Sequence, residues 1–284
     1  MDLGLQGKTA LVLAASRGLG RAIAAELAAE GANVMVSSRN EDALATTAAE
    51  IHGATGAEVA HFTADVTKDQ DIQRLVAQTA ERFGGVDALV TNTGGPPAGT
   101  FEDFENEEWQ RAFELTLLNV VRAVRAVLPY MRERDGGRIV NVASSSIKQP
   151  IEGLTLSNTF RAGIAGLAKT LSVELAPHGI LVNTLGPGRI STDRSAGMDA
   201  SQAEAQGVSV EEVRAEMSAR IPLGRYGTPE ALAKVAAFLV SPANTGVRKR
   251  KNLKDRVPCL PRRWLATRAF RAYHDLRGLR LAIA

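Results

Sequence analysis

Short apolar runs alternate along this chain with longer segments in which apolar residues recur at helical spacing, and this alternation constrains the fold more than any other feature. The apolar runs predict strands at 8–13, 33–37, 58–62, 86–90, 138–142 and 180–183. Between them the spacing is that of Leu19, Ile23 and Leu27, which is typical of an amphipathic helix. Strands that alternate with helices indicate βαβ units. We therefore expect an α/β fold with one doubly wound parallel sheet, whose ligands bind beyond the carboxyl ends of the strands.

The length and composition are those of a single globular domain. The chain has 284 residues, of which 45% are hydrophobic and 23% charged. No apolar run approaches the ~20 residues that cross a bilayer, and the first residues lack the basic and apolar stretches of a signal peptide. The single cysteine, Cys259, permits no internal disulfide. We expect a cytoplasmic protein, and the four histidines show no metal-ligand spacing.

Charge divides the chain into two regions, 1–244 and 245–284. The second region holds 12 of the 34 Lys and Arg residues but only two of the 31 Asp and Glu residues, which gives it a net charge of +10. The first region is left with −7, which argues against nucleic acid as its main ligand. Contact with nucleic acid or a membrane is therefore expected only through the basic tail, which could equally be a segment without function.

A glycine-rich loop follows the first predicted strand. Its residues, Ala14-Ala15-Ser16-Arg17-Gly18-Leu19-Gly20, lead directly into the first predicted helix. Glycines at this place let the backbone approach a dinucleotide pyrophosphate, which the helix N-terminus favours electrostatically. The alternative is that the glycines serve only tight packing of the strand on the helix.

The end of the second strand distinguishes between the two nicotinamide cofactors. An acidic residue there binds the ribose 2′-hydroxyl of NAD, whereas an arginine accommodates the 2′-phosphate of NADP. This chain has Ser38 and Arg39 at that point, and Arg17 of the glycine loop belongs to the same patch. The residues favour NADP over NAD, although Arg39 by itself could be a solvated loop charge.

Over residues 5–244 the chain resembles the short-chain dehydrogenase/reductase family. Asp65-Val66, Asn92-Thr93-Gly94-Gly95 and Pro187-Gly188, with Thr192, resemble the motifs that follow strands three, four and six in that family. More narrowly, the chain is similar to the 3-oxoacyl-acyl-carrier-protein-reductase-like branch with an atypical nucleotide motif and catalytic tetrad. The segments that carry this narrower resemblance are 14–16, 95–97, 157–161 and 221–225.

The resemblance implies a single Rossmann domain at 1–244 that binds NADP. The cofactor residues that it implies are Ala14, Ser16, Arg17, Gly18, Leu19, Gly20, Ser38, Arg39, Asp65, Val66, Asn92, Thr93, Gly94, Arg161, Pro187, Gly188, Ile190 and Thr192. One departure concerns Leu13-Ala14, where the family usually has Thr-Gly. A methyl group at position 14 would crowd a backbone that is left-handed or closely approached by another group.

The catalytic positions depart further from the family pattern. The family uses a serine, a tyrosine 13 residues later, a lysine four residues after the tyrosine, and an asparagine on the preceding helix. At these positions the chain has Ser144, Ser157, Arg161 and Thr116. Only the serine is retained.

These replacements change what the site can do with a proton. A phenol has a pKa of ~10, within reach of tuning by a nearby cation, whereas a serine hydroxyl is far more basic and shorter. Arginine stays charged and cannot relay a proton. Lys148 is the candidate replacement acid, its alternative being an exposed loop charge. Ser157 could hydrogen-bond substrate or water, or cap a helix.

Two hypotheses follow for the function. The first is an NADP(H)-dependent oxidoreductase that reduces a carbonyl, 3-oxoacyl-like or a small ketone, or oxidises the matching alcohol. The second is a catalytically weak or inactive nucleotide-binding pseudoenzyme that acts as a sensor or assembly subunit.

A polar helical stretch at about 191–226 resembles the family's substrate lid. The family's seventh strand is expected to be missing or altered, because its pattern stops after Gly246. Homo-oligomerisation is expected from the resemblance.

Overall fold

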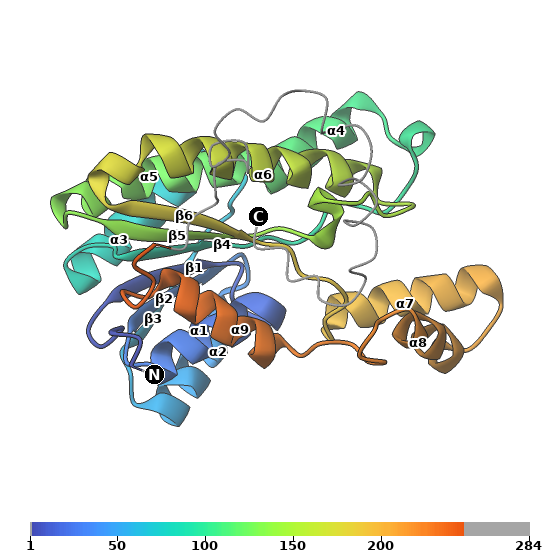
Figure 1. Ribbon diagram of the computed structural model, residues 1–284, viewed down its shortest axis with the longest axis horizontal. Coiled ribbons are helices and arrows are strands. Elements are labelled where there is room, and N and C mark those ends of the chain that lie inside the picture. The colour runs from blue at the N-terminus through green and yellow to red at the C-terminus, as the bar shows by residue number, and fades with distance from the viewer. Residues whose placement is uncertain (1, 247–284) are drawn as a thin grey trace, which may run out of the picture.

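The computed structural model describes residues 2–246, which form a six-stranded parallel sheet with helices on both faces (Figure 1). The strand order is β3-β2-β1-β4-β5-β6, so the direction of winding reverses between β1 and β4. Ligands bind at such a reversal in doubly wound sheets. The strands are β1 (Thr9–Leu13), β2 (Asn33–Ser38), β3 (Val59–Thr63), β4 (Ala88–Thr91), β5 (Gly137–Val142) and β6 (Ile180–Leu185).

The expected α/β fold with one doubly wound parallel sheet is thus confirmed. Each predicted strand is present, with its ends shifted by up to two residues: the run at 86–90, for instance, becomes Ala88–Thr91. No seventh strand occurs in residues 2–246. Most of the basic tail, 247–284, lies outside the described residues, and so does the single cysteine, Cys259.

Helices cover the two faces of the sheet in two groups (Figure 1). One face carries α1 (Gly18–Ala29), α2 (Glu41–Thr55) and α9 (Pro229–Val240). The other carries α3 (Asp69–Phe83), α5 (Asn119–Glu133) and α6 (Thr155–Glu174), with α4 (Asn106–Phe113) leading into α5. None of the described helices is long and apolar enough to cross a membrane.

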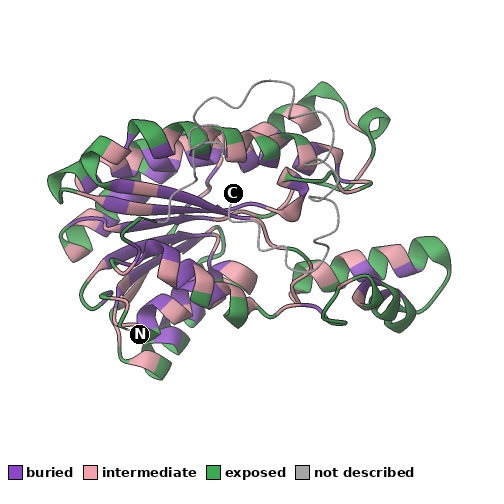
Figure 2. Ribbon diagram, viewed as in Figure 1, coloured by how far each residue is buried: buried purple, intermediate pink, exposed green. Residues whose placement is uncertain are grey.

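The apolar runs form central strands because both of their faces are buried (Figure 2). All five residues of β1 are buried. Ala10 and Val12 point into the core under α1 and α9, whereas Leu11 and Leu13 point into the core under α3 and α5. Successive side chains of a strand point to opposite faces, so an unbroken apolar run supplies both cores.

Two further helices, α7 (Asp193–Gln206) and α8 (Val210–Ala219), stand apart from these layers, beside the end of the sheet where β6 leads into them (Figure 1). Their own small core contains Val213 and Tyr226. The Tyr226 hydroxyl donates to the buried carboxylate of Asp199, which also pairs with Arg189 at 2.9 Å. The expectation of a helical stretch at 191–226 is confirmed.

Candidate active site

The glycine loop joins β1 to α1 with two residues in the left-handed region. Ala14 has φ of +49° and Gly18 has φ of +58°. Helix α1 begins at Gly18 without a side-chain cap and without an acidic residue in its first turn. Its first N–H groups therefore have neither a capping oxygen nor a nearby negative charge, which is the condition that suits a bound phosphate.

Gly18 and Gly20 serve the loop in different ways. A Cβ at Gly20 would lie 2.9 Å from the Ala15 Cα and 2.9 Å from the Asn92 Nδ2, so this glycine is needed for packing. A Cβ at Gly18 would meet only the Thr192 methyl group, at 4.0 Å. The packing alternative therefore describes Gly20, whereas Gly18 leaves open space beside the loop.

Two arginines are the candidate contacts for a 2′-phosphate: Arg39 directly after β2, and Arg17 in the glycine loop, whose Ala15 N–H donates to the Ser37 carbonyl near the end of β2. Arg17 and Arg39 are exposed, and neither has a hydrogen-bond or ion-pair partner within residues 2–246. Ser38 is half-buried beside them, and its Oγ is buried without a partner in the same part of the chain. The polar side-chain atoms of these three residues therefore have no hydrogen-bond or ion-pair partner in the described part of the chain.

The ends of β3 and β4 complete this edge of the sheet. Asp65 accepts hydrogen bonds at Oδ1 from the backbone and hydroxyl of Thr67, which leaves Oδ2 open, and Val66 is buried. Asn92 Nδ2 donates to the Ala14 carbonyl at 3.2 Å and so ties β4 to the glycine loop. Gly94 has no atom within 4 Å of the Cβ position.

Ser144 and Lys148 lie on a short 3-10 turn after β5. The Ser144 Oγ accepts a hydrogen bond from the Ser146 N–H at 3.1 Å and caps this turn. Its own O–H proton is therefore free to be donated. Lys148, at the end of the turn, is exposed.

Ser157 and Arg161 lie on the first turns of α6 and are both buried, with 4% and 7% of their surface exposed. Arg161 Nε donates to the Ser157 Oγ at 3.2 Å, and its NH1 donates to the carbonyls of Val142 and Ala143. The capping role considered for Ser157 is wrong, because α6 starts at Thr155 after an N-cap at Leu154. The Arg161 guanidinium instead fastens α6 to the end of β5.

Burial lowers the pKa of Arg161 to about 10, with a smaller contribution from the nearby Arg194 charge. The guanidinium therefore stays protonated at neutral pH. It supplies a fixed positive charge under the site and no transferable proton.

Thr116 lies in a π-helical turn, Glu114–Leu118, that links α4 to α5. Its hydroxyl is fully buried and has no partner within the described residues. Asn119, one turn on, donates its amide to the Leu115 carbonyl. A π turn interrupts the regular helical hydrogen bonds and often marks a functional site.

The loop after β6 brings α7 toward the sheet. The Pro187 carbonyl accepts from the Ser145 N–H at 2.9 Å, Gly188 is exposed, and Ile190 bridges to Gly227. Thr192 caps α7 through Ser195.

The sequence interpretation missed Arg194, whose guanidinium lies against the Gly95 backbone where a side chain would need space. Its position two residues after Thr192 was the only signal.

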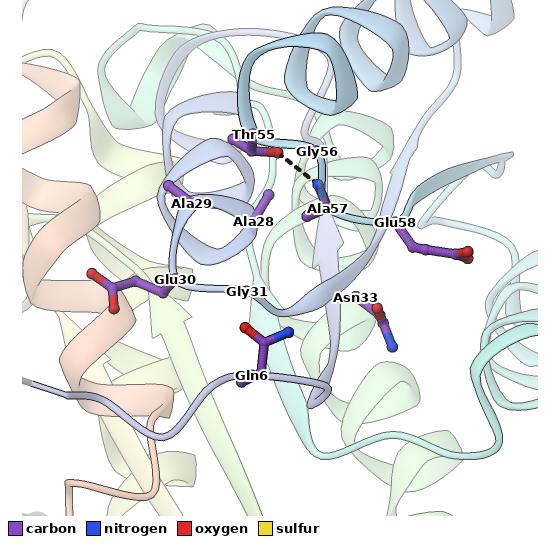
Figure 3. A pocket seen from close by; sticks show the side chains of 10 residues that line it. All are labelled: Gln6, Ala28, Ala29, Glu30, Gly31, Asn33, Thr55, Gly56, Ala57 and Glu58. Atoms are coloured by element: carbon purple, nitrogen blue, oxygen red, sulfur yellow. Dashed lines mark hydrogen bonds between the residues drawn. The ribbon is translucent and has the colours of Figure 1, made fainter.

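A hollow of about 470 Å³ lies at the opposite edge of the sheet, near the starts of β2 and β3 (Figure 3). Asn33 and Glu58 border it, together with Glu30 and Gly31 at the end of α1. Two acidic side chains do not suit a phosphate-bearing ligand. Within the described residues no group of three or more potential metal ligands was found either, so the carboxyl edge is the candidate site.

Residues 13–250 match the family model described as enoyl-(acyl carrier protein) reductase. The chain belongs to the short-chain dehydrogenase/reductase family. A 3-oxoacyl-acyl-carrier-protein reductase of Vibrio cholerae is 34% identical over 240 residues, which cover 84% of this chain and 92% of that protein.

Solved structures of this family have the same fold. A variant of actinorhodin polyketide ketoreductase with NADPH superposes with a TM-score of 0.81 at 37% identity, covering 85% of this chain and 93% of that one. An L-sorbose reductase of Gluconobacter frateurii, complexed with NADPH and L-sorbose, has a TM-score of 0.84 at 31% identity, covering 87% and 95%.

Proposed function

We propose that this short-chain dehydrogenase/reductase is an NADP(H)-dependent oxidoreductase that reduces a carbonyl compound or oxidises the matching alcohol. The observation that carries the proposal is the pair of unpartnered guanidinium groups, Arg17 and Arg39, beside the open N-terminus of α1. Two free cations, one in the glycine loop and one directly after β2, suit a ribose 2′-phosphate and not a bare hydroxyl. The NADPH complexes of two relatives support the same choice.

The residues at this edge fit the dinucleotide. We assign the pyrophosphate to the N–H groups of the loop at Ser16–Gly20 and the 2′-phosphate to Arg17, Ser38 and Arg39. Asp65 and Val66 would contact the adenine. The remaining contacts follow the order of the strands and fall to Ala14, Asn92, Thr93, Gly94, Pro187, Gly188, Ile190 and Thr192. The buried, unpartnered hydroxyl groups of Ser38 and Thr93 support this assignment, because each gains a possible partner.

When bound, the reduced cofactor supplies the hydride. Ser144 then orients the substrate oxygen, since its O–H proton is free while its oxygen accepts from Ser146. Arg161 keeps a positive charge close to the developing alkoxide. The proton that the substrate oxygen receives must come from Lys148 or from water, because the Ser157 hydroxyl is buried and hydrogen-bonded to Arg161.

That last observation also favours the alternative function, a nucleotide-binding pseudoenzyme acting as sensor or assembly subunit. With Ser157 turned toward Arg161, no residue replaces the family's phenol at its own position. Loss of a general acid typically lowers a rate by ~10²–10⁴-fold, so a slow enzyme and an inactive one predict different, measurable rates.

Fluorescence titration with NADPH, and with NADH as control, tests the proposal, followed by a panel of 3-oxoacyl thioesters and small ketones. Preferential NADPH binding with cofactor oxidation is the expected result. Binding without oxidation would select the pseudoenzyme. Binding of neither nucleotide would refute the cofactor assignment.

The proposal includes a cytoplasmic location, which agrees with the single cysteine. It also includes assembly into a homo-oligomer. An aromatic cluster at the start of α4 and α6 supports self-association: Phe101 is 71% exposed and packs edge-on against Trp109, which packs against Phe160. Light scattering of the purified chain and fractionation of cells expressing it are the tests.

A further inference from the structure

Two guanidinium groups of the candidate site, those of Arg161 and Arg194, have no carboxylate partner in residues 2–246. Arg161 is buried and bonds only to Ser157 and two backbone carbonyls. Arg194 reaches from the first turn of α7 to the backbone of Gly95, just beyond the proposed cofactor residues at 92–94. The two charges are close enough that Arg194 contributes to the lowered pKa of Arg161. Like charges placed together without a counter-ion are unfavourable.

The other arginines at 189–225 each have a described partner, which sets Arg194 apart, and Arg225 donates to the Tyr226 carbonyl. Arg189 pairs with Asp199, Arg214 donates to the Ser191 hydroxyl, and Arg220 pairs with Glu216. Arg194 moreover lies in the first turn of a helix, where the macrodipole disfavours a cation. An anion at this place would offset both the dipole and the repulsion from Arg161.

The position of this pair points to the substrate and not to the cofactor phosphates. At the glycine loop the methyl group of Thr192 lies 4.0 Å from the Cβ position of Gly18, and no atom of Arg194 lies within that distance. Arg161 lies at the other end of the site, on α6 beneath the end of β5 and close in sequence to Ser157. Arg161 donates to the carbonyl of Ala143, the residue before Ser144, so an anion bound between the two cations would lie toward the proposed carbonyl position at Ser144.

We propose that Arg194, backed by the charge of Arg161, binds a carboxylate on the substrate, so that the enzyme selects oxo acids over neutral ketones. The planar guanidinium of Arg194 matches a carboxylate in a two-bond arrangement. Gly95 is needed because any side chain there would displace this guanidinium. The inference rests on the proposed oxidoreductase function and adds its substrate class.

The test is calorimetric titration of acetoacetate and of methyl acetoacetate into the protein saturated with NADP⁺, a pairing that cannot react. Acetoacetate is expected to bind at least about tenfold more tightly than the ester, because only the acid carries the charge. Arg194→Gln is expected to remove this difference by weakening the acid alone. Arg194→Lys should retain part of it, since the charge remains but the two-bond geometry is lost.

Arg220→Gln is the matched control, since it removes an exposed guanidinium from the same lid segment, and it should leave both affinities unchanged. Equal binding of acid and ester by the wild type would overturn the proposal. So would an Arg194→Gln variant that weakens NADPH binding, measured by fluorescence, and spares acetoacetate, because the anion would then be a cofactor phosphate.

Failure of the proposed function gives a separate result. If NADP⁺ does not bind, the oxidoreductase assignment is wrong, and the same two titrations into the nucleotide-free protein still decide whether the arginine pair prefers the acid.

Discussion

Arg161 Nε donates a hydrogen bond to the Ser157 Oγ at 3.2 Å, so the residues at the family's lysine and tyrosine positions bond to each other inside the protein. The same guanidinium holds the carbonyls of Val142 and Ala143, next to Ser144. The pair that the family uses for proton transfer has here become a connection between α6 and β5. Its consequences can be measured separately as stability and as activity.

Replacement of Arg161 by methionine is expected to destabilise the fold. Two buried carbonyls and the Ser157 hydroxyl lose their donor, and unsatisfied buried groups cost about 1–3 kcal/mol. Urea unfolding followed by circular dichroism gives the change in the free energy of unfolding. The exposed Arg132→Met variant is the control and should stay within about 0.5 kcal/mol of wild type. A wild-type value for Arg161→Met would contradict a structural role for the guanidinium.

Ala14→Gly is expected to stabilise the protein by about 0.5–1 kcal/mol and to tighten NADPH binding. Ala14 has φ of +49°, a conformation that is unfavourable for every residue with a Cβ except in special contexts and that glycine adopts freely. Unfolding and fluorescence titration measure the two effects. Ala25→Gly, within helix α1, is the control and should instead lose about 0.5–1 kcal/mol. A destabilised Ala14→Gly variant would mean that the loop gains nothing from releasing this strain.

The glycines of the site predict opposite effects of adding one methyl group. Gly20→Ala brings a Cβ into the Ala15 backbone and Asn92, and overpacking of this kind costs about 1–3 kcal/mol of stability. Gly94→Ala meets no protein atom within 4 Å, so it should fold normally but bind NADPH about tenfold more weakly by blocking the nucleotide's approach. Thermal unfolding and fluorescence titration of both variants separate the two roles. Undiminished NADPH affinity in Gly94→Ala would remove this glycine from the assigned site.

Arg39→Gln is expected to weaken NADPH binding by about tenfold while NADH binding stays the same, because only NADPH carries the 2′-phosphate. The preference for NADPH should also shrink with added salt, since Arg39 is exposed and such contacts are screened. Arg21→Gln, which removes a nearby exposed guanidinium paired with Glu50, is the control. A parallel loss for both nucleotides would point to a phosphate that they share.

Ser144→Ala is expected to lower kcat by about 10²–10⁴-fold on any substrate that the wild type reduces, because the donor to the substrate oxygen is lost. Lys148→Ala should lower kcat as well if Lys148 supplies the proton, and the loss should grow as the pH rises and solvent protons become scarce. Lys169→Ala, an exposed lysine on α6, is the control. An unchanged rate in Lys148→Ala would assign the proton to water.

Sequence periodicity alone was sufficient for the sheet and its helices. The runs around β1 and β5 are apolar because both faces of a central strand are buried, and this requirement is local enough to be visible in one sequence. Of the two backbone arrangements considered for position 14, left-handed or closely approached, the left-handed one is present, because the turn from strand to helix requires it. Strand boundaries were less exact, as for the run at 86–90 that forms β4 at Ala88–Thr91, because the pairing of a strand ends where its neighbours in the sheet end.

The directions of the site side chains were not accessible from the sequence. Spacing placed Ser157 and Arg161 one turn apart on a helix, but the turn of Arg161 toward Val142 and Ala143 depends on how α6 packs against β5. The unpartnered hydroxyl of Thr116 results from a π turn that no residue pattern announced.

The sequence by itself therefore determined the order of strands and helices and the place of the glycine loop, and it supplied the residues proposed for catalysis, since these depend on short-range spacing. The tertiary structure alone decided which of those residues meet. Arg194 reaches Gly95 and approaches Arg161 because the loop after β6 places the first turn of α7 beside the carboxyl edge of the sheet, bringing together three segments that are far apart along the chain. Contacts of that kind arise from packing between elements distant in the sequence, and local residue preferences do not predict them.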